Sequence, residues 1–474
     1  MRHLLILWFV CSRLSAELSG SYLLPLDHEA IQYSKLPLSD PVARLRAKLE
    51  RGETKLAWDE EFGYLRSLLR ELKIPIESQV LVFSKTSFQA PRISPRTPRA
   101  IYFNDTVSVG MVRGGEVLEI ASQDPKQGVI FYTLDLERSE NPRFERRDTC
   151  LQCHASGGTL GVPGLVVRSV YPEPTGMPAF HAGGFITDHR SPLAERWGGW
   201  YVTGKHGSQR HLGNAVARNR DKPQQLEMEG TQNVLDLRDK FDTGAYLSPS
   251  SDIVALMVLE HLTHMTNLIT RVGFETRLAL HYQAGINKAF GRPAEELSES
   301  TRRRIDSAVE EMVDYMLFVD EAPLVEPVQG SNRFAEVFNH QGPRDSKGRS
   351  LRDFDLRTRL FRYPLSFMIY SEAFDQMPGE ARERVLRRLF HILKGKDPSP
   401  KYRRLTAEQR QAIFEILLET KPNLPSYWRL PQTAASSLPL RNTRSVACHH
   451  PPVLPFAQPH LKQVEGDLVR LAIL

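Results

Sequence analysis

Two cysteines and a histidine lie close together in the chain and are the residues best placed to do chemistry. They are Cys150, Cys153 and His154, in the string Asp148-Thr149-Cys150-Leu151-Gln152-Cys153-His154. Two thiols three residues apart can form thioether bonds to the two vinyl groups on one edge of a haem, while the adjacent imidazole ligates the iron. This C-x-x-C-H spacing predicts one covalently attached haem c, with His154 as the proximal iron ligand.

The same thiols could instead form a disulfide, a thioredoxin-like dithiol or half of a zinc site. A zinc site would need a second Cys or His pair at ligand spacing, and the sequence has no second C-x-x-C. A thioredoxin-like pair opens a helix directly after a strand, whereas Gly157, Gly158 and Gly161 soon follow this motif. Four cysteines in 474 residues are too few for a disulfide framework, so haem attachment is favoured.

The other axial position of such an iron decides between electron transfer and binding of a small molecule. Several side chains are candidates for the distal ligand: His211, His206, His189, Met177 and His264. The pair His206 and His211 lies in a polar loop, Met177 lies in a turn-rich loop, and a carboxylate precedes His189 and could orient its imidazole. Each could equally be an ordinary surface or hydrogen-bonded side chain.

A long helical pattern begins near Ser251 and carries two more imidazoles. Helical spacing places several residues on one side of it: Ile253, Met257, His261, His264 and Leu268. These histidines could touch a haem, or they could form a buried pair satisfied by hydrogen bonds. The string from Glu260 to His264 is not the H-E-x-x-H arrangement of metalloproteases, so no zinc is predicted.

Longer strings between residues 79 and 285 carry a family resemblance. They are Tyr102-Phe103-Asn104-Asp105, Arg113-Gly114-Gly115, Arg168-Ser169-Val170-Tyr171-Pro172, Asp188-His189-Arg190-Ser191-Pro192 and Arg196-Trp197-Gly198-Gly199-Trp200-Tyr201-Val202-Thr203-Gly204. With the C-x-x-C-H motif they resemble c-type cytochromes, and more broadly a family of large, exported, single-haem bacterial proteins of uncharacterised function. The resemblance implies kinship rather than a particular activity. The chain differs from small cytochromes c in size and in the β-rich segment before the motif, so their compact helical fold is not expected.

The first residues resemble a secretory signal. A short basic start is followed by the apolar run Leu4 to Cys11 and by a candidate cleavage position after Ala16. Eight apolar residues are far fewer than the roughly 20 needed to span a bilayer, so a permanent anchor is not expected. The sequence predicts a periplasmic or otherwise exported protein without a transmembrane segment once the signal is removed.

Apolar periodicity along the rest of the chain predicts an α+β fold. Two helices are expected within 41–73, and short β-rich runs predict a small antiparallel sheet over 79–135. Later strands are expected at Leu165–Tyr171, Phe180–Ile186 and Trp200–Thr203, and helices at 251–281, 293–318, 356–374, 379–393 and 407–420. The predicted organisation is a signal peptide (1–16), a helical pair plus β-rich region (17–145), a haem segment (146–250), a helical region (251–430) and a disordered tail (431–474).

These features favour electron transfer through one haem. The alternatives are a haem enzyme or small-molecule sensor with an open distal iron site, and a haem that serves a structural or docking role. The net charge of +6 is spread over mixed runs, and no P-loop, zinc-finger or RNA-binding signature accompanies it, so nucleic acid is not an expected partner. A redox partner protein or a small-molecule ligand is expected instead. The tail string Cys448-His449-His450 is interpreted as incidental.

Overall fold

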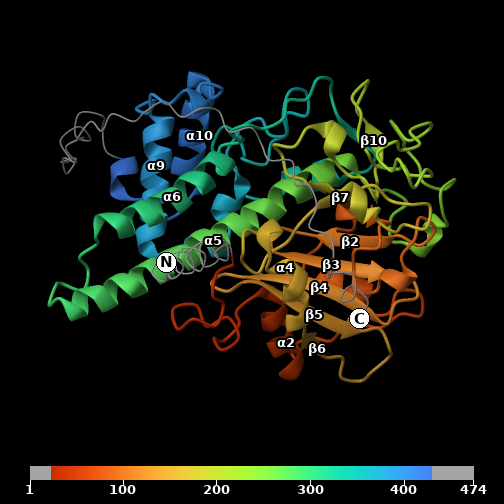
Figure 1. Ribbon diagram of the computed structural model, residues 1–474, viewed down its shortest axis with the longest axis horizontal. Coiled ribbons are helices and arrows are strands. Elements are labelled where there is room, and N and C mark those ends of the chain that lie inside the picture. The colour runs from red at the N-terminus through yellow and green to blue at the C-terminus, as the bar shows by residue number, and fades with distance from the viewer. Residues whose placement is uncertain (1–22, 430–474) are drawn as a thin grey trace, which may run out of the picture. The chain divides into compact units, whose positions relative to one another are not determined.

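The computed structural model describes residues 23–429. The main element of the first half of the chain is a seven-stranded antiparallel sheet (Figure 1). The strand order is β6-β5-β4-β3-β2-β1-β9, so the first six strands form a meander and β9 joins at its edge. The strands are β1 (Val80–Val82), β2 (Arg99–Phe103), β3 (Val107–Val112), β4 (Val117–Asp124), β5 (Gly128–Asp135), β6 (Phe144–Arg146) and β9 (Trp200–Tyr201). Two-stranded pairs are formed by β7 (Arg168–Val170) with β8 (Gly184–Ile186), and by β10 (Gly204–Lys205) with β11 (Gln329–Gly330).

One face of this sheet packs against helices α2 (Pro41–Glu50) and α3 (Leu65–Glu71) in a shared apolar core. The alternating side chains of β4 contribute to this core through Leu118 and Ile120. The Asp40 carboxylate caps α2 and also accepts a hydrogen bond of 2.7 Å from the Tyr132 hydroxyl on β5. One side chain thus starts the helix and attaches it to the sheet.

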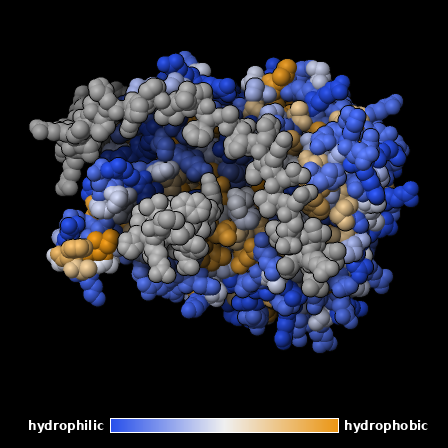
Figure 2. Space-filling model, viewed as in Figure 1, coloured by the Kyte–Doolittle hydropathy of each residue, from blue (hydrophilic) through white to orange (hydrophobic). Residues whose placement is uncertain are grey.

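A single long helix, α5 (Ile253–Ala289), connects the sheet region with the helices that follow. Asp252 begins it by accepting hydrogen bonds from the backbone N–H groups of Val254 and Ala255. Within residues 23–429, only α5 is long and apolar enough by composition to cross a membrane, and 94% of its most apolar stretch is buried in the protein. Tyr282, Ile286 and Phe290 at or next to its far end are exposed. Figure 2 shows hydrophobic surface at the left, on the side where this end of α5 lies in Figure 1.

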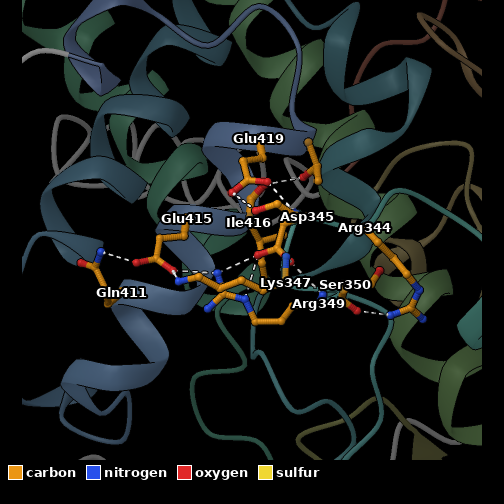
Figure 3. A network of polar contacts seen from close by, with 12 residues as sticks. Arg344, Asp345, Lys347, Arg349, Ser350, Gln411, Glu415, Ile416 and Glu419 are labelled. Carbon is orange, nitrogen blue, oxygen red and sulfur yellow. Dashed lines mark hydrogen bonds and ion pairs between the residues drawn. The ribbon is translucent and has the colours of Figure 1, made fainter.

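The remaining helices pack against α5 and one another. They are α6 (Glu299–Met316), α7 (Phe334–His340), α8 (Glu372–Asp375), α9 (Gly379–Leu393) and α10 (Ala407–Thr420). A polar network joins α10 to the loop around residue 347 (Figure 3). Lys347 and Arg349 donate to the Glu415 carboxylate at 2.8 and 2.7 Å, and these hydrogen bonds, with the one from Lys347 the largest, lower the pKa of Glu415 to about 2.

The predicted α+β class is confirmed, and several elements match in detail. Helices α9 and α10 have the predicted bounds, whereas α5 runs eight residues beyond the predicted end at His281. Strand β6 and helix α7 were not predicted. Strands β7 and β8 are shorter than expected, and a 3₁₀ turn occupies Phe180–Ala182.

The helix predicted over 356–374 is wrong. The chain instead forms turns, a 3₁₀ segment at Phe367–Tyr370 and the short α8. Pro364 lacks an N–H and disfavours helical backbone at the residue before it, and Leu356 adopts a positive φ of 54°. The apolar residues that suggested a helix face fill an aromatic cluster through Phe361 and Phe367.

The predicted segments 17–145, 146–250 and 251–430 belong, up to Leu424, to one compact unit. Their boundaries therefore stay sequence predictions. The predicted signal peptide (1–16), the predicted disordered tail (431–474) and the string Cys448-His449-His450 lie outside the described residues.

Candidate functional site

The cysteine motif forms a short helical turn that follows edge strand β6 and lies against β5 of the large sheet. Strand β6 ends at Arg146, a 3₁₀ turn covers Asp148–Cys150, and helix α4 covers Leu151–His154 (Figure 1). The motif therefore does open a helical turn soon after a strand, contrary to the expectation from its glycines. The helix ends after His154, however, and does not continue as the long helix of a thioredoxin-like site.

Both motif thiols are free in the structure. Cys150 is half-buried and Cys153 is exposed. Burial raises the pKa of the Cys150 thiol to about 11, and the negative charge of Glu119 adds to this effect. Reactive dithiols of the thioredoxin type have lowered pKa values, so the environment of Cys150 argues against that role.

The His154 imidazole is held in one orientation by the backbone that follows it. Its Nδ1 lies 2.9 Å from the Gly164 carbonyl oxygen, which can only accept, so Nδ1 carries the proton. The Gly164 N–H in turn donates to the His154 carbonyl at 2.8 Å. Burial lowers the pKa of His154, which keeps the ring neutral and leaves a lone pair on Nε2. Nε2 has no hydrogen-bond partner among residues 23–429.

Side chains from the sheet surround this turn. The Phe131 ring on β5 lies 4.7 Å from the His154 ring, and the Arg99–Glu119 ion pair of 2.6 Å joins β2 to β4 nearby. A Cβ atom placed on Gly158 would come within 2.8 Å of the Ile186 side chain, which is itself half-exposed on β8. The motif therefore has apolar side chains from β5 and β8 beside it, together with charged groups.

The structure commits His206 and His211 to a loop of their own. Both rings are buried with centroids 4.7 Å apart, and His206 Nδ1 bonds to the Gln209 carbonyl at 2.7 Å. The second nitrogen of His206 accepts from the Asn233 N–H at 3.0 Å. His211 Nδ1 accepts from the Gly213 N–H at 3.0 Å. No contact of these rings within the described residues reaches the cysteine motif.

Met177 lies in the connection between β7 and β8, and 43% of its surface is exposed. The Glu173 N–H donates a hydrogen bond of 2.8 Å to the Met177 carbonyl and so closes this loop. The structure places this side chain at the surface and leaves its predicted role as a distal ligand open.

The remaining histidine candidates, His189 from the loop after β8 and His264 from α5, form a buried cluster with His261 of α5. His189 Nδ1 and His261 Nδ1 are 2.9 Å apart, and His261 Nε2 bonds to the Ser366 hydroxyl at 2.8 Å. His264 lies 3.7 Å from the Asp188 carboxylate. The Tyr315 ring lies against all three imidazoles, at 4.0 to 5.3 Å between centroids.

An ion pair that the sequence analysis missed completes this histidine cluster. Arg196 donates to Glu260 at 2.9 Å with side-chain exposures of 5% and 0%, and its other N–H groups donate to the carbonyls of His189 and Ser191. Burial raises the pKa of Glu260 to about 7, although Arg196 opposes the shift. Glu260 Oε1 and His189 Nε2 are buried without partners. The only sequence signal was a charged residue within an apolar helix.

The donor set at the motif fits a covalently attached haem. Two free thiols occupy one helical turn, and a neutral imidazole beside them has Nδ1 already engaged. Among the described residues, no group of three or more His, Cys, Asp or Glu side chains is arranged to hold a metal ion by itself. The motif could thus supply one iron ligand and two thioether sulfurs, but not a complete metal site.

Comparison with family models, curated proteins and solved structures found no match to this chain. The inference about its function therefore depends on the geometry of the motif and on the chemistry of its residues.

Proposed function

We propose that this protein is an exported haem protein that carries one haem c, bound through Cys150 and Cys153 with His154 as the proximal ligand, and that it transfers electrons. The observation that carries the proposal is the hydrogen bond from His154 Nδ1 to the Gly164 carbonyl. Ligating histidines usually donate their second ring N–H to such an acceptor, which fixes the tautomer and raises the basicity of the ligating nitrogen.

The residues around the motif have distinct roles in this proposal. The two cysteines would anchor the haem through thioether bonds without an enclosing pocket. Once these bonds have formed, the reactivity of the thiols no longer matters. His154 presents Nε2, and Phe131 limits the movement of its ring. When bound, the haem supplies a one-electron couple whose potential depends on its axial ligands and surroundings.

Haem staining after denaturing electrophoresis tests the attachment. The full chain is produced in a bacterial host that has a c-type haem attachment system. Staining after denaturation detects attached haem because covalently bound haem survives denaturation. We expect staining for the wild type and none for Cys150→Ala/Cys153→Ala. Gln152→Ala, an exposed residue between the two cysteines, is the matched control and should stain like the wild type. Staining that persists in the double variant would refute the attachment.

A specific observation keeps the second function, an open distal iron site, in view. His206 and His261 use both ring nitrogens in hydrogen bonds within the protein, and His189 uses one of its two. Adding carbon monoxide to the reduced, purified protein separates the two functions. An unchanged spectrum supports two protein ligands and electron transfer, whereas a shifted Soret band supports a sensor or enzyme.

A further inference from the structure

The segment that orients His154 is itself held by a buried asparagine on α5. The Asn267 side chain is 1% exposed and meets the backbone of Leu165 with both of its polar atoms. The Leu165 N–H donates to Asn267 Oδ1 at 2.9 Å, and Asn267 Nδ2 donates to the Leu165 carbonyl at 2.7 Å. A carboxamide is suited to this task because it offers one acceptor and one donor side by side.

Gly164 lies between this clamp and the histidine. A Cβ atom at Gly164 would lie 2.1 Å from Asn267 Oδ1, so only glycine lets the two groups approach this closely. The same glycine exchanges two hydrogen bonds with His154. Neighbouring bonds support the segment, since the Pro163 carbonyl accepts from Val129 on β5 and the Leu160 carbonyl accepts from Arg271 on α5.

We propose that Asn267 is a positioning residue for His154, acting through the backbone of Leu165 and Gly164. The clamp fixes where the Gly164 carbonyl lies, and that carbonyl fixes the tautomer and direction of the imidazole. The proposal rests on the proposed function for its effect on iron. Its effect on the histidine itself requires no haem.

The first measurement uses the chain without haem. Histidine labelled with ¹⁵N reports the tautomer of each ring, and His154→Gln identifies the signal of His154. In the wild type we expect the Nδ1–H tautomer. In Asn267→Ala we expect mixed tautomers. An unchanged His154 signal in that variant overturns the proposal.

Two further variants separate positioning from general loss of packing. Asn287 is an equally buried asparagine of the same helix, and its Nδ2 donates to backbone carbonyls such as that of Pro293 at 2.8 Å. Asn287→Ala should leave the His154 signal unchanged; an equal change would overturn the proposal. Asn267→Asp keeps the volume and the acceptor but loses the donor, so it should give an intermediate change even if Asn267→Ala folds poorly.

The second measurement uses the haem-loaded chain. A weaker Nδ1 hydrogen bond makes the imidazole a poorer electron donor to oxidised iron, so the reduction potential of Asn267→Ala should rise. We expect a change of about tenfold in the one-electron equilibrium, equivalent to about 59 mV. A potential equal to that of the wild type contradicts the proposed coupling. If the wild type carries no haem, the proposed function fails, and the tautomer measurement still decides the role of Asn267.

Discussion

Helix α5 contacts two regions that contain histidines, the cysteine motif with His154 and the buried histidine cluster, and the two regions use their imidazoles differently. At the motif, Asn267 supports a backbone segment that occupies only one nitrogen of His154. One to two turns earlier on the helix, His264 and His261 belong to a cluster in which imidazoles bond to each other and to their neighbours. His189 of this cluster also has a nitrogen without a partner, but its ring is buried, whereas His154 is half-buried. The difference teaches that a histidine suited to ligation is recognised by a free nitrogen on a ring that is not fully buried, and not by its place on an apolar helix face.

The largest expected effect concerns the buried Arg196–Glu260 ion pair. If the histidine cluster is the region that stabilises the fold, removing this pair should lower the free energy of unfolding strongly. Arg196→Met leaves Glu260 buried without its cation and removes donors from the carbonyls of His189 and Ser191. We expect the free energy of unfolding to fall by about 3–5 kcal/mol, as measured by urea unfolding at pH 8.

Arg196→Met/Glu260→Leu should recover a large part of this loss, because no uncompensated charge remains. A loss below about 1 kcal/mol in the single variant would show that the pair is solvated and that the cluster is not a structural centre.

Acid should reveal the same contrast with a smaller effect. Burial lowers the pKa of His264 to about 4 and that of His261 to about 3, so the folded state binds protons less readily than the unfolded state. Stability is therefore complete above the ordinary value near 6.5 and is lost as the pH falls towards 4. Between pH 7 and pH 5, each of these two histidines should lower the free energy of unfolding by about 2 kcal/mol.

Glu260 acts in the opposite direction. Because its pKa is raised in the folded state, it stabilises the fold as the pH falls from about 7 towards the ordinary pKa of a glutamate. This gain in the free energy of unfolding offsets the loss from about one histidine. Urea unfolding of His264→Gln at both pH values should show about 2 kcal/mol less loss than the wild type. His340→Gln, at an exposed position on α7, serves as the control. Equal pH dependence in the wild type and His264→Gln would contradict the buried, neutral state of His264.

The smallest expected effect sharpens the comparison at the motif. His154→Gln removes one hydrogen bond to a backbone carbonyl and no buried charge, so the unfolding free energy of the haem-free chain should fall by only about 1 kcal/mol. The same substitution should alter the spectrum of the haem-loaded protein. A loss above about 3 kcal/mol would place His154 with the structural histidines.

Local sequence pattern predicted much of the fold. Helix α9 has one clear apolar face, and α10 has good helix formers after a capping box at Thr406, so their bounds could be predicted well. The error at 356–374 arose because apolar spacing alone outweighed Pro364, and aromatic packing decided the backbone there.

The candidate site was predictable only in part. Cys150, Cys153 and His154 are adjacent in the chain, so their spacing was enough to identify them as a group. The clamp of Asn267 on Leu165 joins residues far apart in sequence, and no local pattern indicates it. The commitments of His206 and His189 likewise depend on tertiary neighbours.

The separation between Asn267 and Leu165 also concerns the order of events during synthesis. The two residues are 102 positions apart, so the segment that orients His154 cannot be locked until α5 has been made as far as Asn267. At roughly 5–20 residues per second, synthesis of that stretch takes on the order of 5–20 s. During this interval the motif is present in the chain while its support is missing, so both thiols stay accessible until the fold closes around the imidazole.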